Sequence, residues 1–237
     1  MNKQEKKLIK LQTKAQKCLT HKKLLKYLRN LTKSPKRYQV IDNLLPEEEF
    51  KRIQRYITGT QIPWSFQDGI SLRKSEKGVN NYHFCIIIWD ASQLRLYDDK
   101  QLLASCMPII EAIGTCSQVL RLKLNCSPAT GEGKIVSGFH TDTNVHNLTG
   151  VFYYNTCNGG TVLRLPDGDQ LIEQVENRLV VFPSNTLHAS CTTTDSKARF
   201  LLNLNWLTPS TDPEIIAQQK YDLDEELVDS EDVALKF

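Results

Sequence analysis

The sequence lacks the long apolar runs that mark membrane proteins. Of its 237 residues 40% are hydrophobic, yet no stretch reaches the about 18 apolar residues of a membrane span, and Met1–Lys7 lacks the apolar core of a secretory signal. We find no internal repeat, and the length suits one substantial domain with appendages. The sequence therefore predicts a protein that stays in a cytoplasm and makes no membrane contact.

Cysteine pairs of the kind that bind zinc or stabilise small secreted folds are missing too. The chain holds seven cysteines, an odd number, and none of them lies in a Cys-x-x-Cys pair. Neither a disulfide framework nor a thiolate zinc site is therefore favoured. We interpret the cysteines as buried or free thiols.

The small net charge of +3 hides a strongly basic N-terminal segment. Residues 1–37 hold 13 Lys or Arg and one acid. Leucines recur between the lysines at near-helical spacing and end before Pro35, which predicts one or two amphipathic helices. We expect this basic arm, residues 1–36, to pack on the flank of the domain, and weak contact with nucleic acid or another acidic partner is the alternative.

The opposite end of the chain is acidic. From Asp212 onward the sequence holds nine acids and two lysines, and it begins with the helix-start pattern Asp-Pro-Glu. We therefore divide the chain into the basic arm, a catalytic domain over residues 37–211, and an acidic helix or tail over residues 212–237.

Two histidines and an aspartate indicate a metal site. His140 and Asp142 are separated by one residue, so on a strand both side chains point to the same side. His188 follows the apolar run 178–182 and a proline, which places it just beyond a second strand. Two imidazoles and one carboxylate form the facial triad that holds non-haem Fe(II) and leaves coordination positions open.

The segment around Arg199 predicts a strand with two different faces. A strand that buries one face and carries an Arg and two Asn on the other suits a barrel whose interior binds a polar ligand. A guanidinium there is costly unless a carboxylate pairs with it. The polar face holds Arg199, Leu201, Asn203 and Asn205, and the apolar face holds Phe200, Leu202, Leu204 and Trp206.

The region from Gly138 to Trp206 resembles the Fe(II)/2-oxoglutarate-dependent dioxygenases. Within them it is most similar to the prolyl 4-hydroxylase-like branch, which includes small phage-borne members, so that the cytoplasm would be that of a host if the source is viral. The likeness extends more loosely to Tyr38–Phe50. Its motifs are His140-Thr141-Asp142, Gly150-Val151-Phe152-Tyr153-Tyr154-Asn155, Gly159-Gly160-Thr161, Asn177-Arg178-Leu179-Val180-Val181-Phe182-Pro183, His188 and Arg199.

The resemblance implies a role for each matched residue. The metal ligands are His140, Asp142 and His188, and Arg199 pairs with the far carboxylate of 2-oxoglutarate. Tyr153 matches a strand tyrosine whose hydroxyl helps to hold that carboxylate, although a half-buried strand aromatic would explain it equally well. Asn125 falls where relatives place a residue near the co-substrate, and a structural role is the stronger interpretation for it.

The resemblance also implies the chemistry. Fe2+, 2-oxoglutarate and O2 would hydroxylate a C–H bond with release of succinate and CO2, with ascorbate as a stimulant. We favour peptidyl proline as substrate. A nucleic-acid dealkylase or a hydroxylase of a free small molecule is the alternative, but a dealkylase should carry a base-stacking lid, and Trp64–Gly69 does not resemble one. A binding module without activity would tolerate loss of the triad, which is intact here.

Early helices followed by many short strands predict a mainly β fold with flanking helices, a double-stranded β-helix or jelly roll. Asp167-Gly168 indicates a hairpin and hence antiparallel neighbours. We expect helices at 46–58 and 94–113, and strands at 38–42, 82–90, 119–125, 135–140, 148–155, 161–165, 170–175, 178–182, 187–192 and 199–207.

The basic arm can be tested by salt. If its lysines bound phosphates, the affinity of the full chain for DNA or RNA would fall steeply with salt concentration, and deleting residues 1–33 would abolish it without affecting 2-oxoglutarate turnover. We expect no measurable binding at low salt in a fluorescence-anisotropy titration. Tight, salt-sensitive binding would show instead that the arm is a nucleic-acid contact.

Overall fold

A computed structural model describes residues 37–69, 82–114, 116–129, 131, 133–142 and 147–208. The basic arm, the acidic tail and His146 lie outside the described residues, so the domain boundaries stay predictions. Within the described part, no helix is long and apolar enough to cross a membrane.

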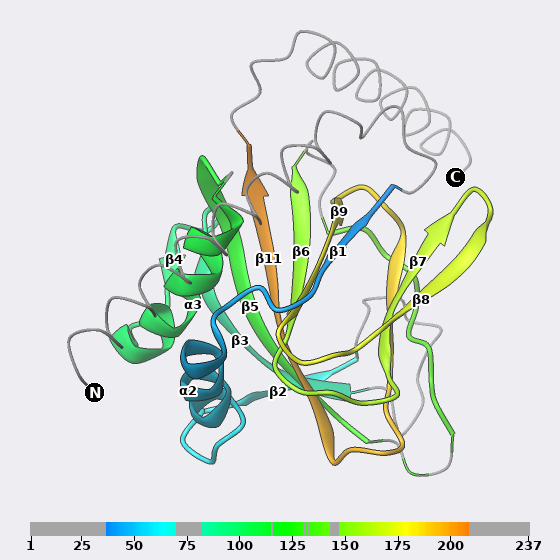
Figure 1. The fold of residues 1–237 in the computed structure, drawn as a ribbon, viewed down its shortest axis with the longest axis horizontal. Coiled ribbons are helices and arrows are strands. Elements are labelled where there is room, and N and C mark those ends of the chain that lie inside the picture. The colour runs from blue at the N-terminus through cyan, green and yellow to red at the C-terminus, as the bar shows by residue number, and fades with distance from the viewer. Residues whose placement is uncertain are drawn as a thin grey trace, which may run out of the picture.

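Two antiparallel sheets face each other and form the jelly roll that the sequence predicts (Figure 1). The larger runs in the order β1-β9-β6-β11-β5-β3-β2 with β4 on β3, and the smaller in the order β10-β7-β8. The larger sheet consists of β1 (Gln39–Ile41), β2 (Ser65–Asp68), β3 (Tyr82–Asp90), β4 (Arg95–Leu96), β5 (Gln118–Pro128), β6 (Leu148–Tyr153), β9 (Arg178–Pro183) and β11 (Ala198–Leu207), and the smaller sheet of β7 (Gly160–Leu165), β8 (Gly168–Glu173) and β10 (His188–Cys191).

Two helices, α2 (Glu47–Ile57) and α3 (Lys100–Ile113), cover the larger sheet on the side away from β7 and β8 (Figure 1). The prediction for α2 is confirmed. The helix predicted from residue 94 begins later, because the Asp99 side chain accepts hydrogen bonds from the amides of Gln101 and Leu102, both at 2.9 Å, and caps the helix there. Residues 91–94 form a turn instead, and β4 follows it.

The core confirms the two faces predicted for the strand around Arg199. Leu202, Leu204 and Trp206 are at most 1% exposed and pack against both helices, whereas Arg199 and Leu201 point to the other side of the sheet. Strand β11 pairs with β5 on one side and with β6 on the other, in a register that places Leu202 opposite Leu124 and Phe152. One face of this strand therefore stabilises the domain while the other is available to a site.

Three further details differ from the sequence prediction. The strand expected over 135–140 is reduced to isolated bridges of Val136 with Cys191 and of His140 with His188. The sequence pattern missed β2, because all four of its side chains are exposed and the strand therefore has no alternating apolar signal. The hairpin near Gly168 is confirmed, but its turn lies at residues 166–167, and Gly168 itself has a φ of 119° at the start of β8.

Asn177 ties the chain entering α2 to the turn before β9. It is 2% exposed, and its φ of 60° lies in the left-handed region. Its side chain accepts a hydrogen bond from the Leu45 amide at 3.0 Å and donates one to the Leu45 carbonyl at 2.8 Å. Both backbone groups of Leu45 thus find their partners in one buried amide, which holds α2 in place.

We predict that Asn177→Ala lowers the free energy of unfolding by about 2–4 kcal/mol, because it removes both hydrogen bonds to Leu45 and puts alanine in a left-handed conformation. Asn177→Gly also removes the hydrogen bonds, but glycine adopts the left-handed conformation without strain. Its free energy of unfolding should therefore lie between those of Asn177→Ala and the parent protein. Urea denaturation measures the free energy of unfolding of the parent protein and of both Asn177 variants. Equal stability of Asn177→Ala and the parent would contradict the tie.

Candidate metal and co-substrate site

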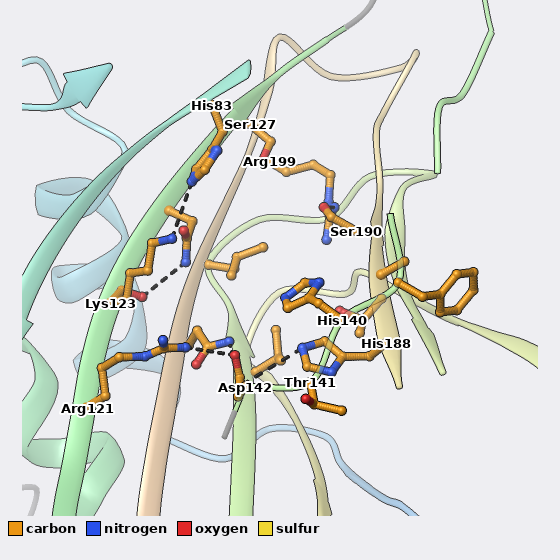
Figure 2. Close-up of a pocket in the computed structure, with 17 residues that line it drawn as sticks. His83, Arg121, Lys123, Ser127, His140, Thr141, Asp142, His188, Ser190 and Arg199 are labelled. Atoms are coloured by element: carbon orange, nitrogen blue, oxygen red, sulfur yellow. Dashed lines mark hydrogen bonds and ion pairs between the residues drawn. The ribbon is translucent and has the colours of Figure 1, made fainter. Parts of the chain in front are cut away.

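A cavity of about 540 Å³ lies between the two sheets. Strands β5 and β11 form one wall, and β10 with the segment 139–142, which bridges to it, forms the other. Figure 2 shows Arg121 and Lys123 facing His140 and His188 across the cavity, with Arg199 near one end. The polar side chains of β5 and β11 thus meet the predicted metal ligands.

The three predicted metal ligands come together in this cavity. His140 and His188 sit opposite each other and exchange two backbone hydrogen bonds of 2.9 Å, so their rings lie side by side with centroids 4.5 Å apart. Asp142 follows, and its amide donates to the carbonyl of Ser184 at 3.2 Å. One ligand atom from each of His140, Asp142 and His188 lies within 4.8 Å of the others.

Backbone carbonyls orient both imidazoles. The Nδ1 atom of His188 lies 2.9 Å from the carbonyl oxygen of Thr186, and that of His140 lies 3.3 Å from the carbonyl oxygen of Gly138. A carbonyl can only accept, so Nδ1 carries the proton in each ring and the Nε2 lone pair is left for a metal. Burial also lowers the pKa of His188 and favours the neutral imidazole that metals bind.

Asp142 is held as a carboxylate by donors from several strands. Its side chain is 3% exposed; Oδ1 accepts from the Arg121 guanidinium at 2.7 Å, and Oδ2 accepts from Thr149 at 2.9 Å, Asn203 at 3.2 Å and Asn205 at 3.1 Å. Burial by itself would raise the pKa of Asp142. The charge that His188 carries when it is protonated, the charge of Arg121 and the bonds from Asn205 and Thr149 outweigh it and hold that pKa well below its usual range. When His188 is neutral, Arg121 and these hydrogen bonds remain to stabilise the carboxylate.

Arg199 lies in the same cavity with one nitrogen unused. The side chain is fully buried; Nε donates to Gln174 at 2.9 Å, and Nη1 donates to the Ser190 hydroxyl and the Cys191 carbonyl at 2.7 Å each. Nη2 has no hydrogen-bond partner among the described residues. Burial lowers the pKa of this guanidinium, so an anion reaching Nη2 would relieve the cost of its charge.

The other two predicted co-substrate residues lie differently. Asn125 lines the cavity, and its amide donates to the Lys123 carbonyl at 3.2 Å. Tyr153 is fully buried, and its hydroxyl donates to Thr161 at 2.8 Å, so Thr161 is the residue of this pair that lines the cavity. Co-substrate contacts of Asn125 and Tyr153 stay predictions.

Sequence reasoning named Asn125 but missed the other polar residues of β5 and β3 that line the cavity. On β5, Arg121, Lys123, Asn125 and Ser127 alternate with apolar residues, and this alternation of period two was the signal that could have found them. The alternation does not by itself show that these residues line a cavity. Their pairing with β11, whose residues lie opposite them in the ladder, shows it. His83 of β3 lines the cavity without any such signal.

The donor set fits the implied groups. Two imidazole nitrogens and one carboxylate suit non-haem Fe(II), and three protein ligands leave further coordination positions for small ligands. The unused Nη2 of Arg199 suits a carboxylate, which a guanidinium binds with charge-assisted hydrogen bonds. The cavity can therefore hold a metal and an anionic co-substrate together.

The sequence matches no protein-family model and no curated protein. Solved structures do resemble it. A prolyl hydroxylase from Trichoplax adhaerens, in complex with a hypoxia inducible factor peptide fragment, has 17% identity and a TM-score of 0.54, over 84% of this chain and 93% of that one.

Two other structures agree. An oxidoreductase of the 2OG-Fe(II) oxygenase family from Burkholderia pseudomallei has 12% identity and a TM-score of 0.56, over 77% of this chain and 90% of its own. The epimerase SnoN, in complex with Fe3+, alpha ketoglutarate and nogalamycin RO, has 12% identity and a TM-score of 0.53, over 78% and 83%. The resemblance seen in the sequence is thus confirmed at the level of the fold: the chain has the fold of the 2-oxoglutarate- and Fe(II)-dependent oxygenases, prolyl hydroxylases among them.

Proposed function

We propose that this protein is an Fe(II)- and 2-oxoglutarate-dependent dioxygenase that hydroxylates a C–H bond, with peptidyl proline as the substrate. The observation that carries the proposal is one cavity that holds the triad His140, Asp142 and His188 together with a fully buried Arg199 whose Nη2 has no partner in the described structure. The triad alone would suit other metal chemistry, and the arginine adds the demand for a carboxylate.

The metal-binding and co-substrate residues each have a task in this proposal. The triad would hold the metal, and Arg199 would bind the far carboxylate of 2-oxoglutarate. When bound, iron and 2-oxoglutarate supply the oxidising chemistry: one oxygen atom of O2 enters the substrate and the other enters succinate as CO2 leaves. Arg121, Thr149 and the two asparagines keep Asp142 ionised and fixed in direction.

Peptidyl proline is supported by the Trichoplax adhaerens structure, which is a prolyl hydroxylase with a peptide bound. A hydroxylase of a free small molecule is the alternative. A nucleic-acid dealkylase has less support, since Phe139 is the one Phe, Tyr or Trp among the described cavity residues and the Arg164 guanidinium covers its ring at 3.7 Å. Cytoplasmic location and stimulation by ascorbate stay predictions.

The first test is oxidation of a prolyl peptide pool with Fe(II), 2-oxoglutarate, O2 and ascorbate. The parent protein should form succinate and a peptide heavier by one oxygen atom, both read by mass spectrometry. Asp142→Ala should lose bound iron and turnover, because the carboxylate ligand is gone. Asp142→Asn, which preserves the shape, should also lose activity and controls for misfolding.

His146→Ala is the matched control for the triad. His146 lies four residues after Asp142 in the sequence, and we do not assign it to the triad, so the variant should retain most activity. Iron content and succinate formation at the parent level in both Asp142 variants would remove the basis of the proposal.

The second test addresses the co-substrate. A charge-assisted pair contributes on the order of 1.5–3 kcal/mol, so Arg199→Met should raise the Michaelis constant for 2-oxoglutarate roughly 10- to 150-fold while the metal content is unchanged. Tyr153→Phe should raise it less, since it removes a hydroxyl and no charge. Thermal denaturation verifies that each variant is folded. An unchanged constant in folded Arg199→Met would show that the arginine serves structure alone.

A further inference from the structure

Lys123 is a half-buried cation that lines the cavity, and the proposed chemistry leaves it unused. It lies on β5 between Arg121 and Asn125, and its Nζ is 3.4 Å from Nε2 of His83 on β3. Figure 2 shows the Lys123 and His83 side chains on the wall opposite His140 and His188. A molecule bound beside the metal ligands would therefore face this ammonium across the cavity.

His83 is a hydrogen-bond acceptor for this ammonium and carries no compensating charge. Burial and the neighbouring charge of Lys123 lower the pKa of His83 to about 4, so the imidazole is neutral near pH 7. Lys123 then donates one N–H to Nε2 of His83, and an ammonium has two more N–H groups to offer. Burial also lowers the pKa of Lys123, because the ammonium is incompletely solvated in the cavity.

No carboxylate of the described residues forms an ion pair with Lys123 within 4.0 Å. Among the described residues, Asp142 is the one carboxylate that lines the cavity, and the Arg121 guanidinium already binds it at 2.7 Å. The two charges of 2-oxoglutarate would be matched by the metal and Arg199. A cavity filled in this way still has an excess of positive charge, and Lys123 is the cationic side chain of its described lining that has neither a carboxylate partner nor a part in binding 2-oxoglutarate.

We propose that Lys123 binds a carboxylate carried by the primary substrate, so that the preferred substrates are acidic peptides with Asp or Glu next to the target proline. This inference rests on the proposed function and names the substrate class of the same site. Because the proposed substrate is a peptide, the anions that it carries are the carboxylates of Asp and Glu, which the remaining N–H groups of this ammonium can bind. The residue contributes binding and specificity, and the metal ligands are separate from it.

The test uses matched capped peptides, acetyl-Gly-Pro-Glu-amide against acetyl-Gly-Pro-Gln-amide and acetyl-Glu-Pro-Gly-amide against acetyl-Gln-Pro-Gly-amide. With the parent protein, kcat/KM for the acidic member of at least one pair should be roughly 10- to 100-fold higher, the size of one charge-assisted contact. Lys123→Met should abolish the preference through KM, and Lys123→Glu should turn it toward peptides with Lys in that place.

Two controls separate this role from the others. Lys100→Met changes an exposed lysine at the start of α3 and should leave the acid preference intact. Lys100→Met should also form succinate without peptide at the parent rate, and Lys123→Met should retain the parent Michaelis constant for 2-oxoglutarate, because Arg199 is the proposed partner of that co-substrate. In the metal-free protein, the acidic peptide should protect Lys123 but not Lys100 from reductive methylation, measured by peptide mass spectrometry.

The outcomes are distinguishable. An undiminished preference for acidic peptides in folded Lys123→Met would overturn the inference. A raised Michaelis constant for 2-oxoglutarate in the same variant would also overturn it, because Lys123 would then be a co-substrate residue. Equal use of acidic and amide peptides by a protein that turns over 2-oxoglutarate normally would also overturn it and leave the proposed function intact. If the parent protein forms no succinate under any condition, the proposed function itself is wrong.

Discussion

The register of β11 is the constraint on which the rest of the structure depends. Antiparallel ladders with β5 and β6 send every second side chain, including Trp206, into the helix-covered core and the intervening ones, including Arg199, toward the cavity. A shift by one residue would exchange the two sets. If Arg199 faced the helices, its charge would be buried among apolar side chains and would lose its hydrogen bonds to Gln174 and Ser190. The free-energy cost of that burial disfavours the shifted register and so stabilises the site.

The site is built from groups that act on one another rather than from three ligands alone. Asp142 is useful as a ligand because Arg121 and the neighbouring hydroxyl and amide groups keep it charged in a buried place. The two histidines present Nε2 because backbone carbonyls take their other nitrogen. These partners come from β5, β6, β11 and the loops beside β10, so the ligand geometry requires the whole roll and not a local motif.

Prediction from the sequence succeeded where a side-chain pattern is repeated and failed where backbone pairing decides. The alternation around Arg199 predicted the two faces of β11, and the triad pattern named three residues that the structure brings within reach of one another. The strand expected over residues 135–140 was wrong because an irregular segment can bridge β10 at two points without forming a ladder. The start of α3 was wrong because the capping side chain of Asp99 outweighed the apolar pattern before it.

The sequence by itself determined the fold class, the candidate ligands His140, Asp142 and His188, and the two faces of the last strand, because each follows from side-chain chemistry at a fixed spacing. Only the tertiary structure decided which polar groups share the cavity. Arg121 reaches Asp142, Lys123 reaches His83, and Arg199 retains an unused nitrogen because strands distant in sequence are brought side by side. Such neighbours depend on the register between strands, which the sequence of one strand cannot specify.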